Sequence, residues 1–160
     1  MAWREGAACI AVLLAAGCAE AGACRPGLRI ETHPEGQMLA RLATGPRPGA
    51  FALHFVHSVS LTPVTSRYMI KGGRIVQRTE EFDQHGAGLP SGPAEPGSRL
   101  ERRDGRFVLH LRREIPDLLV RVGAEHRNRL EGAETLDLTR WGDRRLRLRP
   151  EECSRGSEGP

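Results

Sequence analysis

The feature that most limits how this chain can fold is a two-residue alternation of apolar side chains within short segments. Phe51, Leu53 and Phe55 alternate with other residues, and this period places all three on one face of a β-strand. Segments of the same kind recur along the chain, separated by turn residues. They cover residues 28–31, 37–42, 51–56, 64–70, 75–82, 98–103, 106–113, 118–122, 135–138 and 144–149. The pattern predicts about nine or ten short strands.

Turn residues between these segments indicate which strands pair. Residues 33–36 read His-Pro-Glu-Gly, which is typical of a tight turn. The glycines of Lys71-Gly72-Gly73-Arg74 and of Asp104-Gly105 can adopt the positive φ angles of two-residue hairpin turns. We therefore expect an all-β, single-domain fold, either an antiparallel sandwich or a small barrel, after an N-terminal signal segment.

The length and composition of the chain exclude several classes of protein. The chain has 160 residues, of which 28% are charged and 4% aromatic, and this length suits one domain with one core. No apolar run approaches the roughly 20 residues of a membrane-spanning helix, so a polytopic membrane protein is excluded. The sequence contains no phosphate-binding loop, dinucleotide fingerprint or zinc-type spacing. We therefore expect no cofactor.

The N-terminal residues have the pattern of an export signal. Arg4 precedes an apolar run over residues 7–17, which has the length of a signal-peptide core. Small residues before Cys24 predict cleavage at that point, and a partial lipobox at Cys18 leaves lipid anchoring there as the alternative. We expect a periplasmic or otherwise exported protein with a signal peptide over 1–23, a β-domain over 24–149 and a disordered tail over 150–160.

Two of the four cysteines, Cys24 and Cys153, bracket the expected mature domain. In an oxidising compartment they can form a disulfide that joins the two ends of the domain. The alternative is a pair of free thiols in frayed ends. Both alternatives stay open at this point.

His57 ends the apolar face that Phe51 begins, so its imidazole is expected to point inward at the end of a strand. One interpretation makes His57 a base or ligand contact, and the other makes it a histidine that is hydrogen-bonded to the backbone at a strand end. Its neighbour Ser58 should point to the opposite face, which argues against nucleophilic catalysis. The histidines are scattered without chelating spacing. We therefore predict no catalytic residue and no metal site.

The 24 basic side chains against 20 acidic ones raise the question of nucleic-acid binding. Arg145, Arg147 and Arg149 alternate with leucine, as expected of a half-buried edge strand with a solvated charged face. Few aromatic side chains are present for base stacking, and acidic residues are interspersed with the basic ones. We therefore expect no nucleic-acid partner.

Three short motifs follow one another in the sequence. Residues 51–59 read FALHFVHSV, Thr62-Pro63-Val64 follows after a short gap, and the long connection after residue 82 contains Gly86-Ala87-Gly88-Leu89-Pro90. In this order and spacing they resemble the small exported bacterial proteins of the family called domain of unknown function 1850. Two positions depart from the usual pattern of that family. Ser66 stands where an acidic residue is common, and His85 stands where an aromatic residue is common.

The resemblance implies association with tripartite ATP-independent periplasmic (TRAP) transporters, and hence an accessory role in solute uptake. Our first hypothesis is an exported, non-enzymatic protein that contacts the membrane subunit or the solute receptor through residues 85–90. Glycines in that loop expose main-chain donors, and Leu89-Pro90 would be an apolar anchor.

Two further hypotheses belong to other functional classes. A small-ligand binding domain would use a polar pocket around His57, Ser58, Thr62 and Tyr68, and a hydrolase would use Ser58 and His57. The motif residues can also be simple fold devices that fix turns. Across the binding hypotheses the candidate residues are His57, Ser58, Thr62, Pro63, Tyr68, His85, Gly86, Gly88, Leu89 and Pro90.

Overall fold

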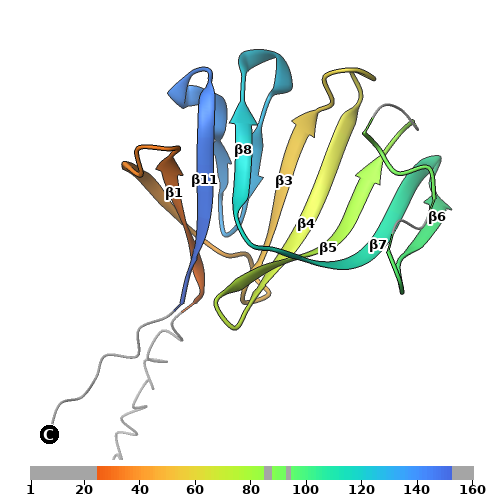
Figure 1. Ribbon diagram of the computed structural model, residues 1–160, viewed down its shortest axis with the longest axis horizontal. Helices are drawn as coiled ribbons and strands as arrows, with labels where there is room; N and C mark the ends of the chain where they lie inside the picture. Colours follow the sequence, from red (N-terminus) through yellow and green to blue (C-terminus); the bar gives the residue numbers. More distant parts are fainter. Residues whose placement is uncertain (1–24, 85–87, 93–94, 153–160) are drawn as a thin grey trace, which may run out of the picture.

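Two antiparallel β-sheets pack against each other in the computed structural model, which describes residues 25–84, 88–92 and 95–152 (Figure 1). The strands are β1 (Gly27–Thr32), β2 (Met38–Ala43), β3 (Ala50–Val56), β4 (Pro63–Lys71), β5 (Arg74–Phe82), β6 (Arg99–Arg103), β7 (Arg106–Ile115), β8 (Leu118–Val122), β9 (Arg129–Glu131), β10 (Thr135–Asp137) and β11 (Arg144–Glu151), with two short 3-10 helices, η1 (Ala124–His126) and η2 (Leu138–Trp141). One sheet has the order β2-β1-β11-β8 and the other the order β10-β9-β3-β4-β5-β7-β6. The fold is thus a sandwich rather than a closed barrel, and the all-β prediction is confirmed.

The tight hairpins predicted from glycine are present. β4 turns into β5 at Gly72 and Gly73, with φ of 56° and 67°. β6 turns into β7 at Asp104 and Gly105, with φ of 51° and 82°. Positive φ at both central residues gives a turn whose twist matches that of the flanking strands. These turns fix the neighbours of β5 and β7 in the larger sheet.

The chain after β8 differs from the expectation. β9 has three residues, too few for an alternation to be recognised in the sequence. The segment 135–138 is a strand only as far as Asp137, whose carboxylate accepts a hydrogen bond of 2.9 Å from the N–H of Thr139 and caps η2. β11 continues to Glu151, two residues past the boundary expected at 149.

The expectation that the arginine-rich last strand lies at an edge is wrong. β11 lies between β1 and β8 and pairs with both. The alternation itself is confirmed, because Leu146 and Leu148 are buried while Arg145 and Arg149 are exposed. Alternation indicates which face of a strand is buried, and it carries no information on whether both edges are paired.

The four-stranded sheet covers one part of the inner face of the seven-stranded sheet. Leu28, Ile30 and Leu146 from the smaller sheet belong to one buried cluster with Phe51 and Tyr68 from the larger sheet. The Phe51 and Tyr68 rings stack with their centroids 5.0 Å apart. This cluster forms the contact between the two sheets.

A second buried cluster lies further along the same inner face. It contains Val64, Phe82, Leu109 and Leu111 from β4, β5 and β7, together with Leu89. Leu89 comes from the connection between β5 and β6 and is only 9% exposed. The long glycine- and proline-rich connection therefore supplies part of the core.

None of the helices in the described part of the chain has the length and apolarity that crossing a bilayer requires.

Replacing Leu89 with alanine tests whether the β5–β6 connection is a core element. We expect Leu89→Ala to lower the free energy of unfolding by about 2 to 3 kcal/mol, because the side chain leaves a cavity over the sheet. Leu119, at 41% exposed, provides the matched control, and Leu119→Ala should change stability by about 0.5 kcal/mol or less. Urea denaturation followed by circular dichroism measures the stability of both variants. Equal stabilities of Leu89→Ala and Leu119→Ala would contradict the assignment of Leu89 to the core.

Candidate functional site

The connection from β3 to β4 joins two of the three sequence motifs and is held together by its own backbone hydrogen bonds. The N–H of His57 donates to the carbonyl of Thr62 at 2.9 Å, and the N–H of Leu61 donates to the carbonyl of His57 at 2.9 Å. β3 ends just before His57, and β4 begins just after Thr62. The connection, residues 57–62, is therefore a compact loop at one end of the larger sheet, near the top of Figure 1, and we call it the His57 loop.

The imidazole of His57 is directed at the backbone of this loop. Its Nδ1 accepts hydrogen bonds from the N–H of Val59 at 3.3 Å and from the N–H of Ser60 at 3.2 Å. In the neutral ring an accepting Nδ1 places the proton on Nε2. These two backbone amides occupy the Nδ1 lone pair that His57 would need in order to act as a base at that atom. This is the arrangement of a histidine bonded to backbone at a strand end.

The hydroxyl groups beside His57 are arranged within the same loop. Ser58 is exposed, and the hydroxyls of Ser60 and Thr62 lie 2.8 Å apart. Among the hydrogen bonds of the described residues, none joins the Ser58 hydroxyl to the His57 ring. Pro63, also exposed, opens β4.

Two apolar side chains project from this loop. Val59 is 65% exposed and Leu61 is 75% exposed, and we call the pair the apolar tip. Leu61 has a φ of 53°, a left-handed conformation that costs a residue with a side chain roughly 1 kcal/mol or more. The bonds to His57 hold the loop in this shape, so the motif histidine sets the position of the apolar tip.

Leu89 of the third motif packs on the inner side of the same end of the sheet. Leu89 shares its cluster with Val64, the last residue of the Thr-Pro-Val motif, and Phe55 packs against that cluster. Gly88 is exposed with a φ of 86°, and Pro90 is half-buried. The candidates His85 and Gly86 lie outside the described residues. The structure thus brings Leu89 to the strand ends that flank the His57 loop.

Tyr68 lies apart from the other candidates. It is opposite Phe51 in the register of β3 and β4, within the contact between the sheets. Burial raises the pKa of Tyr68 to about 12, although its hydrogen bond with Ser66 acts in the opposite direction. Ser66 is itself buried and stands opposite Glu80 of β5, so a carboxylate reaches this face from the adjacent strand. The expected polar pocket does not include Tyr68 together with His57.

A groove with a basic lining lies on the outer face of the larger sheet, next to the His57 loop. It has a volume of about 490 Å³ and is lined by His54, Thr65, Arg106, Arg127 and Arg129 together with the ends of β3 and β4. We call it the basic groove. In the strand register His54 stands between Thr65 of β4 and Arg129 of β9, so these side chains share one face of the sheet.

Several polar groups of the basic groove are held by neighbours. His54 Nε2 lies 2.8 Å from a carboxylate oxygen of Glu131, and its Nδ1 lies 3.0 Å from the hydroxyl of Thr65. Arg106 donates to the carboxylate of Asp83 at 2.5 Å and to the carbonyl of Pro63 at 3.2 Å. The first of these arginine contacts ties β7 to the residue after β5, and the second ties β7 to the start of β4.

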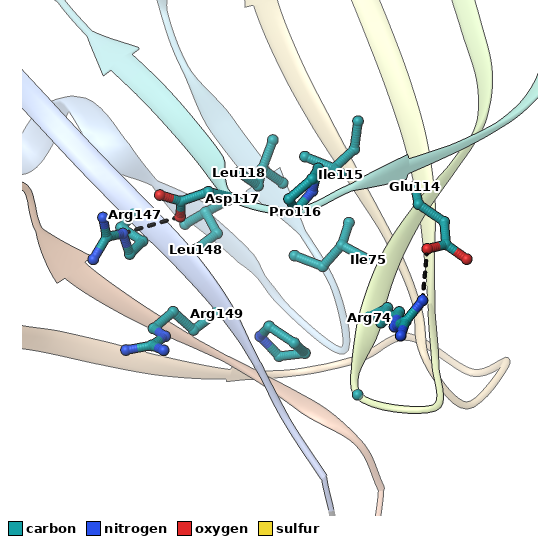
Figure 2. Close-up of a pocket in the computed structure, with 12 residues that line it drawn as sticks. Arg74, Ile75, Glu114, Ile115, Pro116, Asp117, Leu118, Arg147, Leu148 and Arg149 are labelled. Atoms are coloured by element: carbon teal, nitrogen blue, oxygen red, sulfur yellow. Dashed lines mark hydrogen bonds and ion pairs between the residues drawn. The ribbon is translucent and has the colours of Figure 1, made fainter.

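A larger cleft opens at the opposite end of the fold, beside the Gly72-Gly73 hairpin (Figure 2). Its volume is about 670 Å³. An ion pair of 3.0 Å between Arg147 and Asp117 lies on one side, and an ion pair of 2.9 Å between Arg74 and Glu114 lies on the other. Apolar side chains lie between the two pairs, with Ile75 near the centre of the view.

The cysteine predictions fall on residues that the structure does not describe. Cys18, Cys24 and Cys153 lie outside the described ranges. The strands next to Cys24 and Cys153 are paired, with Gly27 opposite Glu151. The disulfide and the lipid anchor therefore stay predictions.

The apolar tip and the arginines of the basic groove were not identified from the sequence. The exposure of Val59 and Leu61 could have been predicted, since apolar residues that follow the end of a strand and lie within a turn are not positioned to pack into the core. Arg106, Arg127 and Arg129 carry no such signal. Strand pairing alone brings them together from β7 and from the residues after η1.

Replacing His57 tests its role in the loop. We expect His57→Ala to lower the free energy of unfolding by about 1 to 2 kcal/mol, because two backbone N–H groups lose their acceptor. Hydrogen exchange should speed up at the amides of Val59 and Ser60. Ser58→Ala is the control and should leave both quantities unchanged. Unaltered exchange in His57→Ala would show that the imidazole does not hold the loop.

Comparison with known proteins agrees with the resemblance in the sequence. The model of a family described as Domain of unknown function (DUF1850) matches residues 51–138. This span is more than half of the chain, and it contains the His57 loop, Leu89 and the basic groove. No curated protein and no solved structure matches the chain. The chain belongs to the DUF1850 family.

Proposed function

We propose that this chain is an exported, non-enzymatic accessory protein that docks onto the membrane subunit or the solute receptor of a TRAP transporter. The class of partner comes from the resemblance of its motifs to proteins associated with such transporters. The observation that carries a docking role is the apolar tip, where Val59 and Leu61 are the two most exposed large hydrophobic side chains of the described residues. Exposed apolar groups on a fixed loop are typical of protein contact sites.

The energy available at the apolar tip is enough to matter for binding. Full burial of a valine or leucine side chain contributes about 1.5 to 3 kcal/mol. The two side chains are already partly covered, so a partner that buries them gains about 3 kcal/mol in total. The loop is held by His57 before binding, so little conformational entropy is lost when the partner arrives.

The use of His57 favours docking over chemistry. A general base needs a free lone pair and a group that orients it toward a nucleophile. His57 Nδ1 instead accepts from two backbone amides. Leu89 is likewise engaged in the core, so we assign the docking role to the apolar tip rather than to residues 85–90.

A double substitution at the apolar tip tests the docking proposal. We expect Val59→Ser with Leu61→Asn to weaken capture of the purified transporter subunits at least about tenfold, because the apolar contact is lost. Asparagine is chosen because it tolerates a positive φ. The measurement is pull-down with the mature chain, together with solute uptake by cells that carry each variant.

The control substitutes exposed apolar side chains elsewhere. Met38→Ser with Leu119→Ser removes such residues from the four-stranded sheet and should leave capture and uptake unchanged. Equal capture by the tip variant and the wild type would reject the apolar tip as the docking site. Absence of capture by the wild type, with normal uptake after gene deletion, would reject the transporter role.

The cleft of Figure 2 favours a second candidate function, the binding of a small ligand. Its volume of about 670 Å³ lies within the range of small-molecule sites. Arg149 borders the cleft, and no carboxylate of the described residues forms an ion pair with it. A compact molecule with an apolar body and one carboxylate matches this lining.

Thermal-shift measurements with short aliphatic carboxylates and amino acids test the second candidate. A ligand at about 100 times its Kd stabilises the folded chain by about 2.7 kcal/mol, so we expect Tm to rise by several degrees. Arg149→Gln should abolish the rise, and Arg121→Gln, at an exposed position on β8, should keep it. A Tm that stays constant with every compound would exclude ligands of this class.

A further inference from the structure

The basic groove differs from the cleft of Figure 2 in how many of its arginines lack a carboxylate partner among the described residues. The cleft is bordered by arginines and also by Glu114 and Asp117, which pair with two of them. The described residues that line the basic groove include three arginines and one histidine. Asp83 pairs with Arg106 and Glu131 pairs with His54, which leaves Arg127 and Arg129 as the groove arginines without a carboxylate partner in the described ranges. A cavity with this lining attracts an anionic group.

Two of the groove arginines are available to a ligand. Within the described part of the chain, Arg127 and Arg129 have no carboxylate oxygen at ion-pair distance, whereas Arg106 is held by Asp83. Arg129 stands opposite Asp137 in the register of β9 and β10. The carboxylate of Asp137 accepts hydrogen bonds from Thr139, which lower its pKa, and the charge of Arg129 lowers this pKa further without an ion pair.

The backbone places Arg127 at a specific point beside the groove. Arg127 follows η1 directly and has a left-handed φ of 46°, while Arg129 begins β9 next to His54 of β3. The two guanidinium groups therefore belong to one short segment that runs from η1 onto the sheet. Arginine binds carboxylates through two parallel hydrogen bonds, so such a pair suits an acidic segment.

The apolar tip and the basic groove adjoin along the chain. β3 contributes His54 and Val56 to the groove and then enters the His57 loop, and the chain leaves that loop through Pro63, which also lines the groove. A partner that covers the apolar tip therefore reaches the arginines with its neighbouring residues. Glu81, Asp83 and Glu131 lie around the groove through their contacts with Arg106 and His54. A narrow acidic segment can approach Arg127 and Arg129 between these carboxylates, whereas a flat anionic membrane would lie against them and be repelled.

We infer that the docking partner presents an acidic peptide segment, and that Arg127 and Arg129 bind its carboxylates in the basic groove while the apolar tip contacts an adjoining apolar side chain. The inference rests on the proposed docking function and specifies the chemistry of the partner. Because exposed ion pairs are screened by salt, the interaction weakens as ionic strength rises.

A fluorescein-labelled hexaglutamate peptide is the probe, measured by fluorescence anisotropy with the mature chain. We expect binding whose Kd rises about fivefold between about 50 and about 300 mM salt. Arg127→Asp with Arg129→Glu should weaken binding about tenfold or more. The neutral pair Arg127→Asn with Arg129→Gln should weaken it by a smaller factor, and it serves if charge reversal prevents folding.

The matched control reverses two exposed charges on the smaller sheet. Arg121→Glu with Arg144→Glu makes the same change in net charge away from the groove and should retain hexaglutamate binding. Equal losses in the two reversed variants would indicate a general charge effect and overturn the inference. Preference for inorganic phosphate, or for vesicles of phosphatidylcholine and phosphatidylglycerol, over hexaglutamate would also overturn it.

The outcomes separate this inference from the docking proposal. If hexaglutamate does not bind but the wild type captures the transporter subunits, the acidic segment is rejected and docking stands. If hexaglutamate binds through Arg127 and Arg129 but no subunit is captured, the acidic-peptide site is supported and the transporter role fails.

Discussion

The inner face of the seven-stranded sheet is longer than the four-stranded sheet that packs on it, and the remaining apolar surface must be covered in another way. Val64, Phe82 and Leu109 line that surface, and Leu89 from the β5–β6 connection packs over them. Leaving these side chains in water would cost several kcal/mol. Leu89 is thus committed to the core, so this side chain is not free to serve as an external contact.

The same constraint organises the end of the larger sheet where the sequence motifs meet. Leu89 packs on its inner side, the basic groove lies on its outer side, and the His57 loop joins the two strands between them. His57 has a structural action with a functional consequence, because its bonds to two amides fix the loop that carries Val59 and Leu61. One loop therefore contains both the histidine that stabilises its shape and the apolar side chains proposed to contact a partner.

Alternation and turn glycines were enough to predict the sandwich class, the tight hairpins and the inward face of β3. They did not predict β9, which is too short to show a period, or the internal position of β11, because pairing at both edges leaves no trace in the alternation. For the site, the sequence allowed two interpretations of His57, and hydrogen bonding between its ring and the backbone was one of them. The groove of Arg106, Arg127 and Arg129 depends on long-range strand pairing, which local patterns do not encode.

The pairing of β1 with β11 has a consequence for the orientation of the molecule. β1 begins and β11 ends at the lower end of the view in Figure 1, where Gly27 is opposite Glu151 in the register, and the connection between β3 and β4 lies near the upper end. Any tether attached before β1 or after β11 would therefore hold the domain at one end. The His57 loop would then be exposed at the opposite end. Such a domain would reach outward from its attachment point like a spacer, with its contact surface at the far tip.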